Sequence, residues 1–183
     1  MDSLLKNFNE VSDGVFYSRD KKTKIDIKVI KELSAHVGKT KLRRARICAH
    51  LDEEDDLQEM FVAVEKGSFI RPHKHLTKCE SLSVIEGTAI AIFFHDSGSI
   101  SDAFYIGRES KDHRFYYRIS SPIFHMLIII SELFVFHEAT TGPFRREDSV
   151  YSPWSPDEKD KIACEKYIES IRSLALERID QSS

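Results

Sequence analysis

Residues 67–87 read GSFIRPHKHLTKCESLSVIEG, and they hold the most informative pattern in the chain. His73 and His75 are separated by one residue, so on a β-strand both side chains project from one face and can present a ring nitrogen to one point. Glu80, beyond a short turn, can add a carboxylate oxygen, and His125 can supply a third imidazole from a later strand. Such ligands bind first-row divalent ions such as Fe, Mn, Ni, Cu or Zn, and ligand type alone does not choose among them. The pattern therefore predicts a site for one divalent transition metal.

Short β-rich segments follow one another from residue 44 onward. Ala45 and Ile47 lie on one face of the first segment, and Arg46 and Cys48 lie on the other. Further segments are expected at 60–66, 69–75, 80–86, 88–94, 103–106, 114–119, 123–130 and 133–139. Seven or more short strands in succession predict an all-β core, either a sandwich or a barrel.

Helical patterns flank this region. Apolar residues recur at helical spacing over residues 26–37, with Asp26 as N-cap and Gly38 as the stop. Near the C-terminus, the run from Ser155 to Glu158 has the pattern of a capping box, so a second helix is expected to begin there. Its apolar face would pack against the outside of the β-core or across a subunit interface. Packing within one chain is the more common arrangement of such a helix, and packing across the interface of a homodimer is the alternative.

Length and composition indicate one water-soluble globular domain. The chain has 183 residues, of which 41% are hydrophobic and 31% charged, and it is long enough to bury a core. Its longest apolar run, Met126 to Ile130, is far below the roughly 18 residues that span a bilayer. The N-terminus lacks the apolar segment of a signal peptide, and three cysteines without a CxxC pattern fit a reducing compartment. We therefore expect a cytoplasmic protein that binds no membrane.

The charge is unevenly distributed. Residues 19–46 contain eleven Lys or Arg against three acids, and the acidic run Asp52 to Asp56 follows. One interpretation is two solvated surface patches; the other is that the basic segment holds an anionic small molecule. The net charge of −3 and the absence of interleaved aromatic residues argue against binding to nucleic acid.

The wider spacing of the metal-ligand pattern resembles a known family. A His-x-His pair alone more often marks a surface strand, but the intervals between Gly67, His73, His75, Glu80 and Gly87 match the first cupin motif at every fixed position. The resemblance implies a double-stranded β-helix, or jelly-roll, barrel with a metal inside. It also implies the ligand set, which is His73, His75, Glu80 and His125. The second motif, residues 120–125, has its proline three residues before the histidine and lacks the expected glycine.

With this fold, the chain is expected to comprise an N-terminal extension with a helix (1–43), a cupin β-barrel (44–154) and a C-terminal helix (155–183). Pieces of sequence over about residues 44–158 look like the WbuC family of cupin metalloproteins, in particular RARICAH at 44–50, RPHKH at 71–75 and YSPWSPDE at 151–158. Cys48 departs from the asparagine expected in that family. The resemblance implies an association with bacterial O-antigen or other surface-polysaccharide biosynthesis.

Four residues are candidates for substrate binding, namely Arg46, His50, Arg71 and Lys78. Arg71 has the same strand parity as His73, so we expect its guanidinium to point inward. It either pairs with a protein acid or binds the carboxylate or phosphate of a ligand, and we expect the second, with an unpaired guanidinium as the main anion contact. Of His137 and Glu138, on opposite faces of one strand, only one can face the barrel interior.

These features favour a metal-binding cupin that acts on or binds a sugar or nucleotide-sugar intermediate. As an enzyme it would be a metal-dependent isomerase, epimerase or oxygenase. The alternatives are a non-catalytic ligand-binding or regulatory cupin and an Fe(II)-dependent dioxygenase. The expected partner is an anionic small molecule, and no nucleophile elbow, P-loop or dinucleotide-binding fingerprint is present in the sequence.

Overall fold

The structure, a computed structural model, describes residues 4–181 and contains two β-sheets that face each other. The strands are β1 (Phe8–Ser12), β2 (Val15–Ser18), β3 (Arg44–Cys48), β4 (Leu57–Glu65), β5 (His73–His75), β6 (Glu80–Glu86), β7 (Thr88–Phe94), β8 (Ile100–Gly107), β9 (Tyr116–Ile119), β10 (Phe124–Ile129), β11 (Leu133–Thr141) and β12 (Ser149–Tyr151). The helices are α1 (Ile27–Val37) and α2 (Lys161–Asp180), with short 3-10 turns η1 (Leu4–Asn7) and η2 (Arg146–Asp148).

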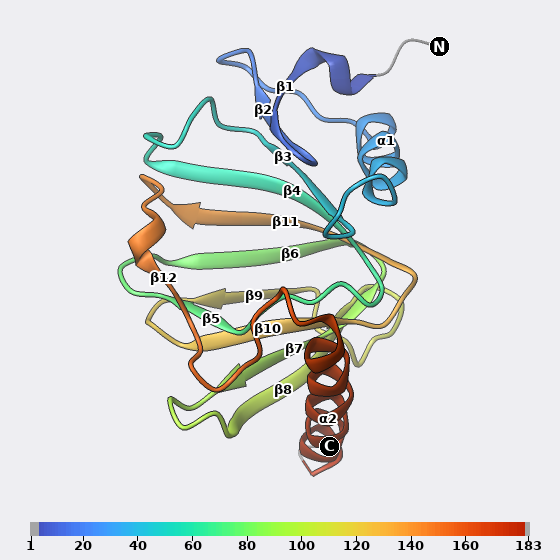
Figure 1. Cartoon of the computed structure of the whole chain (residues 1–183). Coiled ribbons are helices and arrows are strands. Elements are labelled where there is room, and N and C mark those ends of the chain that lie inside the picture. The colour runs from blue at the N-terminus through green and yellow to red at the C-terminus, as the bar shows by residue number, and fades with distance from the viewer. Residues whose placement is uncertain (1–3, 182–183) are drawn as a thin grey trace.

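The strand order is that of a jelly roll. One sheet runs β1-β2-β3-β4-β11-β6-β9 and the other runs β12-β5-β10-β7-β8. All named pairs are antiparallel except β2 and β3. Figure 1 shows the larger sheet passing down the molecule from β1, with the smaller sheet in its lower half and the two ends of the chain at opposite ends. The predicted all-β core with a helix toward each end is thus confirmed. Strands β1 and β2 are not predicted by the sequence pattern.

Alternating residues fill the space between the sheets. The interior cluster joins residues of both sheets, for example Leu82 and Phe136 from the larger sheet and Ala91 and Leu127 from the smaller one. Leu82 is 1% exposed, which shows that this face of β6 is sealed from solvent. Because strand residues alternate between two faces, the side chains that share the parity of Leu82 on β6 also point inward.

Helix α1 covers the outer face of the larger sheet. Asp26 caps it as predicted, accepting hydrogen bonds from the backbone N–H groups of Lys28 and Val29. Leu33 of the helix packs with Ile47 of β3, and both are fully buried. The shared face predicted for Ala45 and Ile47 is therefore the outer face of the sheet, and it packs against this helix.

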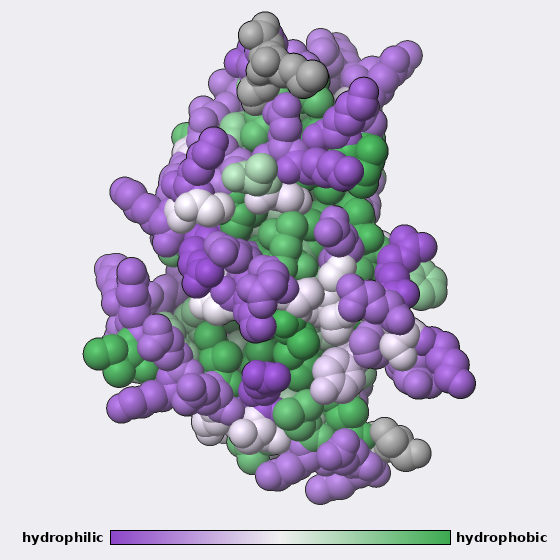
Figure 2. Space-filling view, turned by 90° about the vertical axis from the view of Figure 1, so that its right-hand side faces the viewer, coloured by the Kyte–Doolittle hydropathy of each residue, from purple (hydrophilic) through white to green (hydrophobic). Residues whose placement is uncertain are grey.

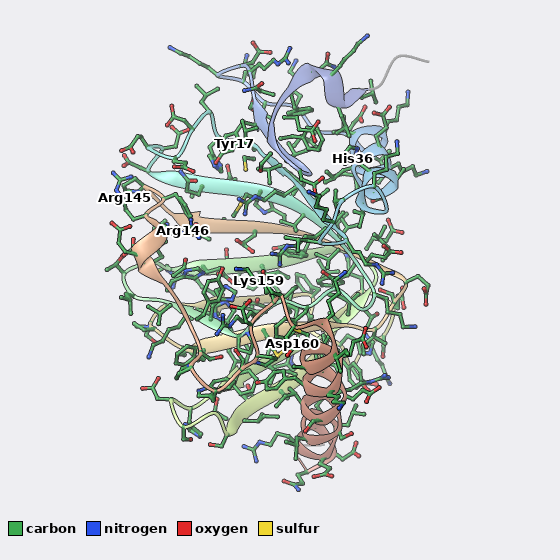
Figure 3. All side chains as sticks on the ribbon, in the orientation of Figure 1. Tyr17, His36, Arg145, Arg146, Lys159 and Asp160 are labelled. Carbon is green, nitrogen blue, oxygen red and sulfur yellow. The ribbon has the colours of Figure 1, made fainter. Side chains whose placement is uncertain are left out.

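Helix α2 packs on the smaller sheet, where Ile171 and Ala175 join the outward residues of β7 and β10. It begins later than predicted. Asp160, labelled in Figure 3, is the N-cap, and its side chain accepts a hydrogen bond from Ala163 N. The expected start at Ser155 is wrong because the Ser155 hydroxyl contacts Ser152 Oγ at 2.6 Å and so does not cap a helix.

The molecular surface is mixed in character. Figure 2 shows the side on which both helices lie: hydrophilic residues spread over it, and hydrophobic residues appear between them in separate patches. Among residues 4–181, no helix combines the length and the apolar character needed to cross a membrane.

Candidate metal centre

The four predicted ligand residues meet at one point inside the barrel. One potential ligand atom from each of His73, His75, Glu80 and His125 lies within 4.8 Å of all the others. The strands explain this convergence, since His73 on β5 pairs directly with His125 on β10, and Glu80 opens β6 after a short turn. The Glu80 carboxylate lies 3.0 Å from His75 Nε2 and 3.5 Å from His125 Nε2. This cluster can hold a metal ion.

Hydrogen bonds to the far side of each imidazole orient the rings. His73 Nδ1 lies 2.9 Å from the carbonyl oxygen of Arg71, and His125 Nδ1 lies 2.9 Å from that of Ile123. A carbonyl oxygen only accepts, so each Nδ1 carries a hydrogen and each Nε2 is directed into the site. His75 Nδ1 contacts Ser149 Oγ at 3.1 Å. Such outer contacts are typical of metal-binding histidines, so the donor set fits a transition metal.

The protonation states of His73 and Glu80 suit metal binding, whereas His125 would release a proton when an ion binds. Burial, with a smaller effect of His125, lowers the pKa of His73 to about 3, so this imidazole is neutral. Burial favours the protonated form of Glu80, but His125 and the other histidines outweigh it and hold the Glu80 pKa well below its ordinary value. Burial likewise opposes the charge on His125, whose pKa is nevertheless raised by the Glu80 carboxylate. Neutral imidazoles and an ionised carboxylate are the forms that bind metals.

A cavity of about 60 Å³ adjoins the cluster and is lined in part by His73, Glu80 and His125. Tyr117 of β9 lines it as well, and its side chain is hydrogen-bonded to Glu80. Glu138 of β11 is the second carboxyl group in the cavity. A metal at the cluster would thus face a space into which a small group of a substrate can enter.

The structure decides between His137 and Glu138. Glu138 pairs across the sheet with Leu82, whose side chain is in the interior core, so Glu138 faces inward. His137 points outward, and its ring packs at a tilt against that of Phe61, with the ring centres 4.9 Å apart. Burial, together with the charge of Glu80, raises the pKa of Glu138 to about 8. Glu138 has no place in the predicted site, because strand alternation alone does not show whether it or His137 faces inward.

Arg71 does not occupy the position expected of it. Its Nε donates to Ser155 Oγ at 3.2 Å, an Nη donates to the Ser152 carbonyl at 3.2 Å, and Asp157 lies 3.5 Å away. The guanidinium also lies 5.1 Å from the centre of the Tyr151 ring. The expectation of an unpaired guanidinium is therefore wrong, because the segment before α2 supplies its partners. A contact between Arg71 and a substrate stays a prediction.

Two other candidates are occupied by protein contacts. His50 is buried, its ring meets Tyr17 edge-on, and its Nδ1 lies 3.1 Å from Glu59 N. Burial lowers the pKa of His50, which favours its neutral form. Lys78 is also buried, and its Nζ lies 4.9 Å from the centre of the Phe144 ring. The structure does not bring either residue into the group of four potential metal ligands. Contacts between these two residues and a substrate stay predictions.

Arg46 differs from these three residues. It lies on the inward parity of β3, between Arg44 and Cys48, and its side chain is exposed. Its charge reaches the cavity: burial and Glu80 raise the pKa of Glu138, and Arg46 acts against them. Arg46 is therefore close enough to Glu138 and to Tyr17 of β2, which Figure 3 labels, for its charge to act on both.

The two-layered jelly roll and its inward cluster of three histidines and one glutamate define a cupin-fold protein with a potential metal site. A family model described as a domain of unknown function, DUF6016, matches residues 25–106. No curated protein matches the chain.

Solved structures show likeness in fold. Protein SO0799 from Shewanella oneidensis is 9% identical with a TM-score of 0.50, over 71% of this chain and 84% of that one. The capsular polysaccharide assembling protein CapF from Staphylococcus aureus is 17% identical with a TM-score of 0.47, over 59% of this chain. The match spans only 31% of the CapF chain. Oxalate decarboxylase from Bacillus subtilis, a protein with Mn(II) centres, is 20% identical with a TM-score of 0.42, over 53% of this chain and 24% of that one.

Proposed function

We propose that this chain is a metal-dependent cupin of the WbuC type that acts on a sugar or nucleotide-sugar intermediate of bacterial surface-polysaccharide biosynthesis in the cytoplasm. The observation that carries the metal-dependent part is the convergence of three imidazoles and one carboxylate beside a cavity. The pathway rests on the sequence resemblance over about residues 44–158.

The surroundings of the cluster favour an enzyme over a purely ligand-binding module. A catalytic metal site keeps a position open to substrate and has a group nearby that can move a proton. His73, His75, Glu80 and His125 would hold the metal, which would supply Lewis-acid polarisation of a substrate carbonyl or hydroxyl. Glu138 lines the same cavity without belonging to the cluster. Because the pKa of Glu138 is raised to about 8 by burial and by Glu80, its carboxyl can hold a proton near neutral pH.

The metal-binding step is tested with His75→Ala. Protein purified without added metal is analysed for metal content, and melting curves are recorded with and without chelator. We expect the parent to lose stability on chelation, because an ion that binds only the folded state stabilises it. His75→Ala should contain less metal and respond less to chelator. The matched control is His95→Ala, since His95 is exposed and lies outside the cluster. Identical responses of His75→Ala and the parent would rule out a metal at this cluster.

The substrate class is tested separately. A panel of nucleotide-sugars and sugar phosphates is screened by thermal shift with metal-loaded protein, and compounds that bind are then incubated with the protein to detect product. Binding with turnover supports the enzyme. Binding without any product supports the ligand-binding alternative, and product formation that requires Fe(II) and consumes oxygen supports the dioxygenase. The absence of binding by every sugar compound would contradict the proposed pathway while leaving the metal site intact.

A further inference from the structure

Glu138 is a carboxyl group that the fold does not use. It faces the cavity beside the metal cluster. Within residues 4–181 no hydrogen bond or ion pair to a protein group is recorded for its side chain. Glu138 is partly exposed, and the part of it that lines the cavity is accessible to a group that enters there. Glu138 is therefore placed to contact something that enters the cavity.

Arg46 is the matching unpaired cation on the same inner face. Arg44, two residues earlier, is 3.4 Å from Glu158, whereas no such partner is recorded for Arg46 in the described part of the chain. The register connects the two unpaired groups: Glu138 on β11 pairs with Met60 on β4, and Met60 pairs with Cys48 on β3. Arg46 shares the parity of Cys48 and lies two residues from it, so its Cα is two strand spacings across and about 7 Å along the sheet from that of Glu138, roughly 12 Å in all.

The surface between these two groups is apolar. Met60 and Val62 of β4 lie on the inward parity between β11 and β3, and Met60 is 9% exposed. A ligand that reaches from the cavity to Arg46 would pass over these side chains. The middle part of such a ligand would thus meet an apolar surface of the protein. The Glu138 carboxyl group would lie at one end of the ligand, and the Arg46 guanidinium would lie at the other.

We propose that Glu138 and Arg46 form a two-point recognition site beside the metal. Glu138 hydrogen-bonds a hydroxyl group of the part that enters the cavity, and Arg46 binds an oxyanion attached to that part. A guanidinium forms paired hydrogen bonds with phosphate or carboxylate, and apolar side chains pack against a sugar ring. Within the proposed function, on which this inference rests, the substrate is a sugar ester of phosphate and not a free neutral sugar.

The test measures equilibrium binding to Mn²⁺-loaded protein by calorimetry. The probes are hexose 1-phosphates and nucleoside diphosphate hexoses, with the corresponding free hexoses and inorganic pyrophosphate for comparison. Arg46→Gln removes the guanidinium. The matched control Lys31→Gln removes one positive charge from the exposed face of α1, on the opposite side of the sheet. Glu138→Leu removes the carboxyl group, and metal content and circular dichroism show whether each variant is folded and loaded.

We expect the phosphate esters to bind the parent more tightly than free hexoses do. Arg46→Gln should weaken ester binding at least tenfold, and Lys31→Gln should leave it unchanged. Glu138→Leu should weaken binding of the sugar esters but not that of pyrophosphate. Equal binding of esters by Arg46→Gln and the parent, or equal binding of free and esterified hexose, would overturn the inference.

The remaining outcomes separate this inference from the proposed function. If the parent protein does not bind a metal ion at the four ligand residues, the metal-dependent function is wrong, whichever ligand Arg46 binds. Pyrophosphate binding that depends on Arg46, without any binding of sugar esters, would support the anion site and overturn both the role of Glu138 and the sugar substrate. Absence of binding by all probes to loaded, folded protein would overturn the two-point site.

Discussion

The backbone carbonyl of Arg71 accepts a hydrogen bond from Nδ1 of His73 at 2.9 Å, and this contact fixes the direction of the His73 ring. The side chain of the same arginine binds Ser152, Ser155 and Asp157. Arg71 therefore connects His73, a potential metal ligand, through its backbone to the segment before α2 through its side chain. That segment is more than 80 residues away in sequence.

Replacing Arg71 by Gln should loosen the segment before α2. The carbonyl contact to His73 remains, whereas the guanidinium contacts are lost. A hydrogen bond to a charged group contributes about 1.5–3 kcal/mol, and the ion pair adds little because Asp157 is exposed to solvent. We therefore expect a loss of about 2 kcal/mol in the free energy of unfolding. Urea denaturation measures this loss. The control Arg118→Gln removes an exposed arginine whose side chain donates a hydrogen bond to the exposed Ser120 at 2.7 Å, and it should change stability by less than about 0.5 kcal/mol.

Replacing Ser149 by Ala should weaken metal binding. The Ser149 hydroxyl is the outer contact of His75, and loss of such contacts lowers metal affinity by about 10–100-fold. Ser149→Thr keeps a hydroxyl and should retain most of the affinity, which is measured by competition with a chelator of known strength. Ser97→Ala serves as control because the Ser97 hydroxyl is exposed and hydrogen-bonds to the exposed Ser99, outside the metal cluster. Unchanged metal affinity in Ser149→Ala would show that the orientation of His75 does not depend on this hydroxyl.

Local sequence patterns predict much of this molecule. Strand parity places His73 and His75 on one face, and the expected segments 80–86 and 88–94 coincide with β6 and β7. Asp26 caps α1 because N-capping depends on neighbouring residues only. These features depend on interactions over a few residues, so one sequence is enough to predict them.

Features set by distant parts of the chain are not predictable in this way. The partners of Arg71 come from beyond residue 150, and the search for an acid near Arg71 in sequence therefore misses Asp157. The Ser155 hydroxyl likewise contacts Arg71 and Ser152 and does not cap a helix, and α2 begins after Asp160. Alternation shows that Glu138 and His137 face opposite ways, but only the pairing of Glu138 with Leu82 reveals which one faces inward.

Replacing Glu138 by Gln should make the metal-free protein more stable at alkaline pH. Burial and Glu80 raise the pKa of Glu138 from 4.5 to about 8, so the folded state holds this proton more tightly than the unfolded state does. The free energy of unfolding then falls as pH rises from about 4.5 to about 8. Glu138→Gln removes that loss, and we expect the variant to gain on the order of 1 kcal/mol or more relative to the parent between pH 5 and pH 8.5.

The measurement is urea denaturation in the presence of chelator at both pH values. Glu169→Gln is the control, since Glu169 is exposed on α2 and its neutralisation should have little effect at either pH. A stability difference between Glu138→Gln and the parent that does not grow with pH would contradict the raised pKa of Glu138.

Replacing Gly87 by Ala should destabilise the turn between β6 and β7 severely, whereas Gly38→Ala should not. Gly87 has φ of +81°, and a Cβ there would lie 2.5 Å from Ser131 Oγ and would also overlap the Leu133 carbonyl oxygen. A left-handed backbone alone costs about 1–2 kcal/mol for alanine, and the overlap adds to it, so we expect a loss of more than about 2 kcal/mol. Gly38 has φ of −63° and open space around its Cβ position, so alanine there should stabilise the protein by about 0.4–1 kcal/mol by restricting the unfolded chain. Denaturation midpoints of the two variants compare these effects directly, and a similar midpoint for both would mean that the turn at Gly87 does not require its left-handed conformation.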